Sequence, residues 1–167
     1  MIPSVLLPLL LTAAGLLAIS GVAKLRNPAP AAVTLGVPEL LVRGGALVEL
    51  AVVVLVVARP GPGAIAAAVL YLAFALLVAF QLRAGVETSC GCLGSAQTPP
   101  SRVHVVLDLT LTLVCTLSAL DPPNPLAALT QGAGALVWTA AATAAWMLVA
   151  GIELLPGAIS AYRRPTA

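Results

Sequence analysis

Two cysteines separated by one residue, Cys90 and Cys92, are the sharpest chemical feature of this 167-residue chain. A disulfide between them needs its Cα atoms within about 7 Å, and Gly91 supplies the backbone freedom to close so tight a ring. A strained disulfide is easily reduced and oxidising, which favours thiol–disulfide exchange over structural stapling. The alternatives are an idle pair of loop thiols or half of a metal site. Because a zinc site needs about four ligands and the chain has one histidine, we predict no metal site.

His104 and Asp108 follow the cysteine pair and are four residues apart, so they share one face of a helix. The histidine could move protons while the thiols exchange electrons, and the aspartate could orient its ring. The alternative is an interfacial histidine with a carboxylate neighbour. Asp108 is the stronger candidate, because an ionisable group inside a membrane is costly and is a functional candidate by default. The predicted catalytic residues are therefore Cys90, Cys92, His104 and Asp108.

Three other ionisable residues, Glu49, Lys24 and Arg83, are further candidates in or beside apolar segments. Glu49 could carry protons, pair with a cationic residue, or stay protonated and bond a polar neighbour, and a packing role is as well founded as a catalytic one. Arg83 could favour the thiolate form of the cysteine pair. Cys115 lies roughly 20 Å along a helix from Arg102, so we expect a buried, inert thiol that does not meet the pair.

The composition identifies the kind of scaffold that must position these residues. Hydrophobic residues make up 60% of the chain and charged residues only 8%, whereas soluble domains carry about 25% charged residues. An aromatic content of 4% argues against the aromatic girdles of a transmembrane barrel, and a net charge of +2 is too small for nucleic-acid binding. We therefore predict an all-α, polytopic membrane protein with no nucleic-acid partner.

The apolar runs predict five transmembrane helices in one domain, residues 1–167. The first run lacks a positive leading region and is too long for a signal peptide, so we interpret it as a span. Prolines, glycines and charges separate the later runs, and Arg59 to Gly63 is a strong turn signal. A short interfacial helix fits residues 29–39. The expected spans are residues 2–23, 40–58, 64–82, 103–120 and 134–155.

Alternation of these spans gathers most of the polar residues at one membrane face. That face holds every Lys and Arg of the chain except Arg59. Because positive loops stay on the cytoplasmic side, we expect the N-terminus outside a cell membrane, and the C-terminus and the Cys-Gly-Cys loop in the cytoplasm.

With these residues in view, the sequence resembles the MauE family, within the wider DoxX-like group of membrane proteins. The resemblance is carried by residues 20–28 (SGVAKLRNP), the stretch around Glu49, and residues 82–94, which include the Cys-Gly-Cys motif. It covers about the first four predicted helices. The chain departs from the family pattern at Leu93, where an aromatic residue is expected, and at Asp108, where asparagine is more usual.

The resemblance implies a DoxX-like four-helix bundle with a fifth helix, and a redox-associated function. MauE is linked to making methylamine dehydrogenase, which has a disulfide-rich small subunit, and other DoxX-like proteins to quinone-coupled sulfur oxidation. Our hypothesis is a thiol–disulfide oxidoreductase that exchanges electrons between a thiol protein partner and a quinone. The alternatives are a non-catalytic assembly or anchor subunit of a redox enzyme and, third, a transporter using Glu49 and Asp108. An exported partner favours the cysteine pair outside, but we follow the charge count.

Overall fold

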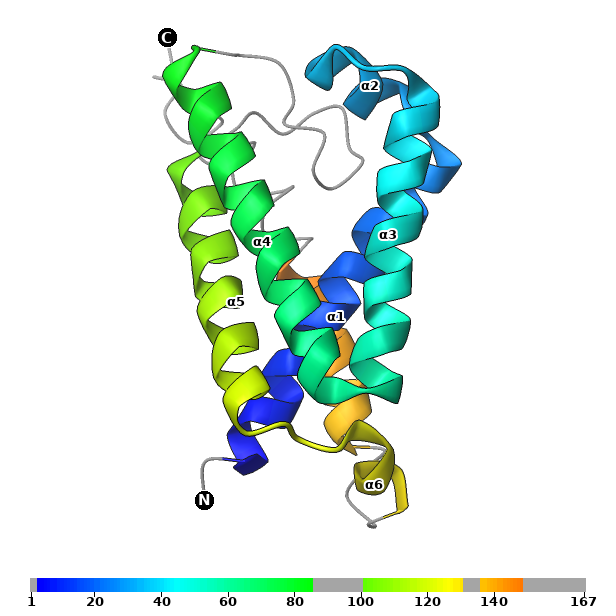
Figure 1. The fold of residues 1–167 in the computed structure, drawn as a ribbon, viewed down its shortest axis with the longest axis vertical. Helices are drawn as coiled ribbons and strands as arrows, with labels where there is room; N and C mark the ends of the chain where they lie inside the picture. The colour runs from blue at the N-terminus through cyan, green and yellow to red at the C-terminus, as the bar shows by residue number, and fades with distance from the viewer. Residues whose placement is uncertain (1–2, 86–100, 131–135, 149–167) are drawn as a thin grey trace, which may run out of the picture.

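A computed structural model of the chain describes residues 3–85, 101–130 and 136–148. All regular secondary structure in these ranges is helical, which confirms the predicted all-α class (Figure 1). The helices are α1 (Pro3–Arg26), α2 (Ala29–Leu35), α3 (Glu39–Ala58), α4 (Pro60–Arg83), α5 (Arg102–Leu120) and α6 (Pro125–Thr130). A further helical segment covers Leu136–Leu148.

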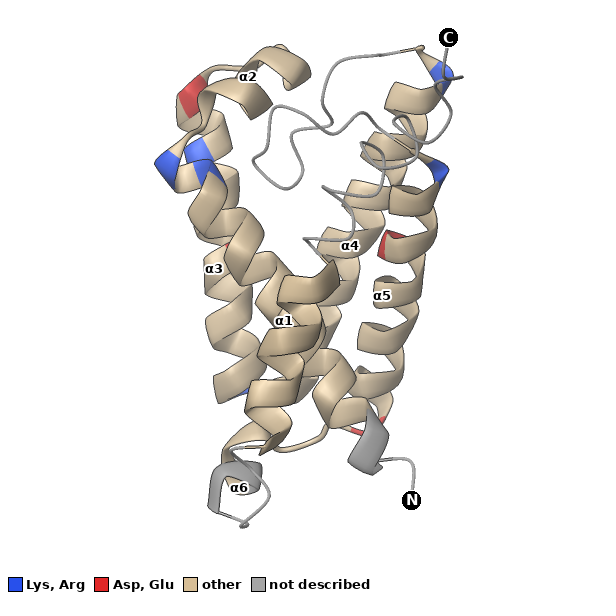
Figure 2. Ribbon diagram, turned by 180° about the vertical axis from the view of Figure 1, so that it is seen from behind, with Lys and Arg blue, Asp and Glu red and all other residues tan. Residues whose placement is uncertain are grey.

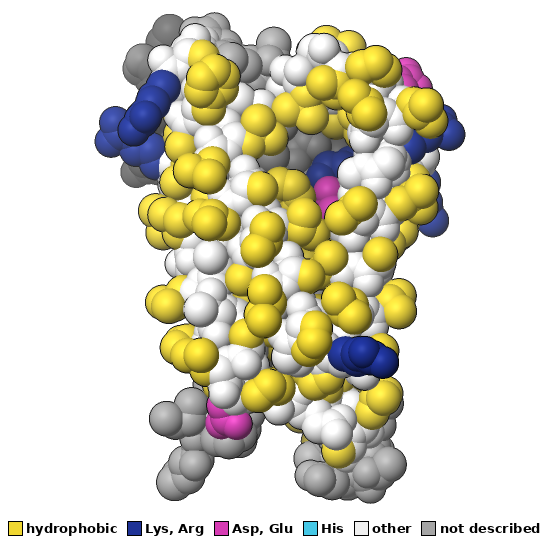
Figure 3. Space-filling view, in the orientation of Figure 1, with side chains coloured by type: hydrophobic (Ala, Val, Ile, Leu, Met, Phe, Trp, Pro, Cys, Tyr) yellow, Lys and Arg dark blue, Asp and Glu magenta, His cyan; other side chains and the backbone are white. Residues whose placement is uncertain are grey.

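Four of these helices, α1, α3, α4 and α5, are long and apolar enough to cross a membrane. Their 19 to 24 residues correspond to about 29–36 Å of helix, against a hydrocarbon core of about 30 Å. Their outer faces carry large exposed apolar side chains such as Val54 and Phe80, and hydrophobic atoms cover much of the face in Figure 3. Surfaces of this kind suit lipid and not water. The chain is thus a multi-pass membrane protein.

The predicted fifth span lies only partly within the described residues. Leu136–Leu148 is helical and apolar, and it packs on α1, where a Cβ built on Gly15 would be 3.0 Å from the Cβ of Ala145. The rest of the expected span 134–155 is outside the described residues. The fifth crossing therefore stays a prediction.

The turn between α3 and α4 is shorter than the sequence indicates. Residues 60–63 belong to α4, and only Arg59, with φ −142° and ψ 82°, separates the two helices. Prolines fit the first turn of a helix because its N–H groups have no intrahelical acceptors. Gly63 lies so close to the preceding helix that a Cβ would be 2.4 Å from the backbone of Val56. The Pro-Gly repeat thus begins a helix packed tightly against its neighbour.

The helices pack as two contacting pairs, α1 with α3 and α4 with α5, and α3 also contacts α4 (Figure 1). Small and aliphatic side chains fill the core, and the Tyr71 hydroxyl donates a 2.6 Å hydrogen bond from α4 to the Ala13 carbonyl of α1. Cys115 lies fully buried in this core, so its predicted burial is confirmed. The main buried cluster contains Leu10, Leu17, Val52, Val56, Ala64, Ala67, Tyr71, Leu111 and Cys115.

Helix direction places most described cations at one end of the bundle. The end of α1, the start of α3, the end of α4 and the start of α5 all lie at the same end of the bundle as α2, and Lys and Arg positions gather at this end (Figure 2). Arg59, in the α3–α4 turn, lies at the opposite end. For the described residues, the predicted gathering of charges at one face is confirmed.

Candidate functional site

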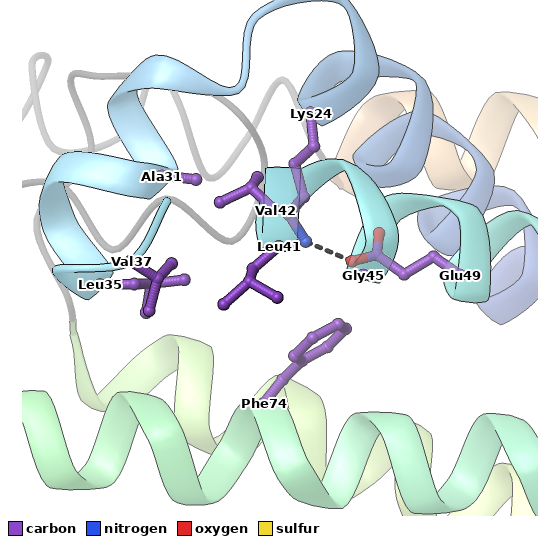
Figure 4. A pocket seen from close by; sticks show the side chains of 9 residues that line it. All are labelled: Lys24, Ala31, Leu35, Val37, Leu41, Val42, Gly45, Glu49 and Phe74. Carbon is purple, nitrogen blue, oxygen red and sulfur yellow. Dashed lines mark hydrogen bonds and ion pairs between the residues drawn. The ribbon is translucent and has the colours of Figure 1, made fainter. Parts of the chain in front are cut away.

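Lys24 of α1 and Glu49 of α3 form a buried ion pair. The Lys24 ammonium donates a hydrogen bond to Oε1 of Glu49 (Figure 4), and the two residues are 7% and 3% exposed. Of the roles that the sequence left open for Glu49, the structure shows pairing with a cation. Lysines near helix ends usually extend toward the membrane surface, whereas Lys24 turns inward to the middle of α3.

Phe74 brings α4 into the same site. The Lys24 Nζ lies 4.9 Å from the centroid of the Phe74 ring, within the distance at which a cation is attracted to an aromatic face. Tyr71 packs edge-on against Phe74, with ring centroids 6.3 Å apart and an interplanar angle of 86°. The ammonium therefore links three helices through one carboxylate and one ring.

A cavity of about 170 Å³ opens beside this ion pair; we call it the Lys24–Glu49 cavity. Its walls are apolar apart from the pair, and Figure 3 shows a hollow between α3 and α4 in which basic and acidic atoms are visible. Within the described ranges, Oε2 of Glu49 is buried without a hydrogen-bond donor. The residues lining the cavity are Lys24, Ala31, Leu35, Val37, Leu41, Val42, Gly45, Glu49 and Phe74 (Figure 4).

His104 occupies the first turn of α5, at the end of the bundle that also holds α2. Its side chain is buried, and its Nδ1 lies 2.7 Å from the Ser101 hydroxyl. Its Nε2 is also buried and has no hydrogen-bond partner among the described residues. Asp108 lies one turn further along α5 and is half-buried. A buried imidazole with one nitrogen held by a hydroxyl keeps the other nitrogen for a proton or a ligand.

The remaining predicted site residues are Arg83, Cys90 and Cys92. Arg83 ends α4 and is exposed. Cys90 and Cys92 lie outside the described residues. Their segment connects Gly85 to Ser101, and both flanking helix ends, Arg83 and Arg102, lie at the α2 end of the bundle.

Sequence reasoning did not name two residues in this part of the bundle as site candidates, the buried Gln81 and the half-buried Phe74. Gln81 of α4 is 5% exposed, and its Oε1 has no partner within the described structure. A polar residue inside an apolar helix is an available signal for such a group. Phe74 carries no comparable signal, because aromatic residues in apolar helices usually serve packing, and only its position beside Lys24 identifies it.

The four membrane-length helices and the buried charges define a polytopic helical membrane protein with a polar site near one end. The family model for methylamine utilisation protein MauE matches residues 2–121, which is most of the chain. The chain therefore belongs to the MauE family. No curated protein and no solved structure matches it.

Proposed function

We propose that this MauE-family protein is a membrane thiol–disulfide redox protein acting through Cys90 and Cys92 during methylamine utilisation. The observation that carries the proposal is the family match over residues 2–121, which includes the Cys-Gly-Cys motif. Support comes from the helices on either side of the motif, because both have their adjoining ends at the part of the bundle where His104 and the Lys24–Glu49 pair lie.

In the proposed reaction, a thiolate of a protein partner attacks one sulfur of the Cys90–Cys92 disulfide and breaks the S–S bond, which gives a mixed disulfide. A second thiolate of the partner attacks the mixed disulfide. The partner is then released with a disulfide of its own, and Cys90 and Cys92 remain in the protein as thiols. A membrane quinone then takes two electrons and two protons from the dithiol, becoming a hydroquinone and restoring the disulfide. His104, whose Nε2 has no hydrogen-bond partner among the described residues, is the proposed proton carrier, and Asp108 supports it electrostatically.

Differential alkylation in native membranes, with mass spectrometry at Cys90 and Cys92, tests this proposal. We expect a disulfide that mild reduction opens and that added quinone restores. Ser101→Ala should slow reoxidation, because it removes the hydroxyl that lies 2.7 Å from His104 Nδ1, whereas Thr116→Ala, at an exposed position on the same helix, should not. Two thiols that stay free before reduction and after quinone addition would refute the mechanism.

A second candidate function is assembly or anchoring of a redox enzyme without electron transfer. The family description favours it to the extent that it names a pathway and no reaction. Replacing both cysteines with serine separates the two functions. An assembly subunit keeps its partner and supports maturation, whereas an exchanger loses activity while its helical content is unchanged.

We also propose that the α2 end of the bundle faces the cytoplasm, because it holds the described cations other than Arg59. In a cysteine-free background, Arg59→Cys should react with a membrane-impermeant maleimide on intact cells. Arg26→Cys should react only after the membrane is opened. The reverse labelling pattern would invert the proposed orientation.

A further inference from the structure

The size of the Lys24–Glu49 cavity limits what it can hold. Its volume is about 170 Å³, and an apolar cavity of roughly 150 Å³ accommodates one benzene molecule. The site therefore has room for one six-membered ring with small substituents. Apolar side chains of α2 and α3 form most of the wall, and Phe74 offers an aromatic ring for edge or offset contact.

The charges on the wall select a neutral ligand. Lys24 and Glu49 cancel each other, so an ionic ligand would meet a like charge beside an opposite one. An ammonium has three N–H donors, and Glu49 is its one hydrogen-bond acceptor in the described structure. The carboxylate likewise has acceptor capacity that the described residues leave unused. A hydroxyl satisfies both groups, because it accepts from the ammonium and donates to the carboxylate.

The mouth of the cavity faces the surrounding bilayer. Leu35 and Leu41, which line it, are 38% and 63% exposed, and the hollow opens between the apolar faces of α3 and α4 (Figure 3). A ligand entering here comes from the lipid phase, so it must be membrane-soluble.

We infer that the Lys24–Glu49 cavity binds a neutral, membrane-soluble aromatic ring bearing a hydroxyl, as in a hydroquinone. The hydroxyl bonds the ion pair, and the ring lies against Phe74 and the apolar wall. The redox meaning of this site rests on the proposed function, in which a hydroquinone is the product of quinone reduction. The binding site itself follows from volume, charge balance and access.

Two neighbouring glycines of α3 provide a matched test. A Cβ on Gly44 or on Gly45 meets no atom within 4 Å, so both positions accept a side chain without a clash. Gly45 lines the cavity and Gly44 does not. Gly45→Leu fills the cavity, whereas Gly44→Leu makes the same chemical change outside it, and both variants gain the higher helix propensity of leucine.

The experiment is calorimetric titration of the full chain in lipid nanodiscs with methylhydroquinone, with the heat of empty nanodiscs subtracted. We expect saturable binding that Gly44→Leu leaves unchanged and Gly45→Leu weakens at least tenfold. The dimethyl ether of the probe should bind about tenfold more weakly, because it cannot donate to the carboxylate.

Equal affinities of the two leucine variants would overturn the site, and equal affinities of the hydroquinone and its ether would show a groove for apolar chains. Saturable, Gly45-dependent binding without quinone-driven oxidation of Cys90 and Cys92 would leave the site standing and refute the proposed function. Reversible, quinone-driven oxidation of Cys90 and Cys92 without binding in this cavity would support the proposed function and refute the binding site.

Discussion

Removing one member of the Lys24–Glu49 pair should destabilise the bundle more than any surface change. Glu49→Leu leaves a buried ammonium that, in the part of the chain the structure describes, faces only the Phe74 ring, and Lys24→Met leaves a buried carboxylate without its cation. Breaking a buried ion pair in this way costs about 3–5 kcal/mol in the free energy of unfolding. The ring offsets part of this cost for the ammonium by about 1–2 kcal/mol, so Glu49→Leu should be the milder single change.

Combining the two substitutions should restore most of the stability. A buried pair replaced by apolar side chains of similar volume is often neutral or stabilising, so we expect Lys24→Met/Glu49→Leu to lie within about 1 kcal/mol of the wild type. The assay is equilibrium unfolding in mixed micelles with increasing SDS fraction, followed by helical ellipticity. The double-mutant cycle then gives the coupling energy of the pair directly.

Arg26→Met provides the control, because it removes an exposed cation two residues along α1. Its expected effect is within about 0.5 kcal/mol. Single variants at Lys24 and Glu49 that cost no more than this control would refute the buried pair. Strictly additive losses in the double variant would show that the two side chains do not interact.

Three other predictions concern packing in the core. Tyr71→Phe removes the buried hydrogen bond to Ala13 and should cost about 0.6–1.5 kcal/mol in the same unfolding assay; a neutral result would contradict that bond. Gly63→Ala should cost at least about 1–3 kcal/mol, because its Cβ would meet the α3 backbone at 2.4 Å. Gly61→Ala should be nearly neutral, because its Cβ would make an ordinary van der Waals contact, 3.4 Å from the ring of Pro122. Equal losses of stability in the two alanine variants would refute the close approach of Gly63 to α3. Cys115 is fully buried, so it should resist maleimide in native membranes and react after SDS unfolding. Mass spectrometry measures the labelling, and a labelled Cys115 before unfolding would show that the core is open.

The four membrane-length helices of the described structure were predictable in their order, because long apolar runs leave the backbone no other way to satisfy its hydrogen bonds in lipid. The boundaries were less predictable where proline is involved. The sequence indicates a turn at residues 60–63, yet they form the first turn of α4. Pro-Gly pairs usually mark loops, and only the tertiary contact between Gly63 and Val56 distinguishes this case.

The sequence indicates which ionisable residues are candidates for the polar site, but it does not indicate which of them form an ion pair. The high cost of Glu49 in an apolar segment indicated a partner, but several cations lie at the same end of the bundle, and sequence spacing does not choose among them. Lys24 is selected by the packing of α1 on α3, a contact between residues 25 positions apart. The cavity depends on the short helix α2 and on Phe74, which are brought to α3 only by the fold.

The one-residue link between α3 and α4 has a consequence for biosynthesis. With only Arg59 between Glu39–Ala58 and Pro60–Arg83, neither helix can be threaded into a bilayer while the other stays in water for long. We therefore expect the pair to enter the bilayer together as a helical hairpin, with Arg59 at its tip. Lengthening this link with flexible residues would uncouple the two insertion events and allow half-inserted chains, which a glycosylation site placed in the link would report.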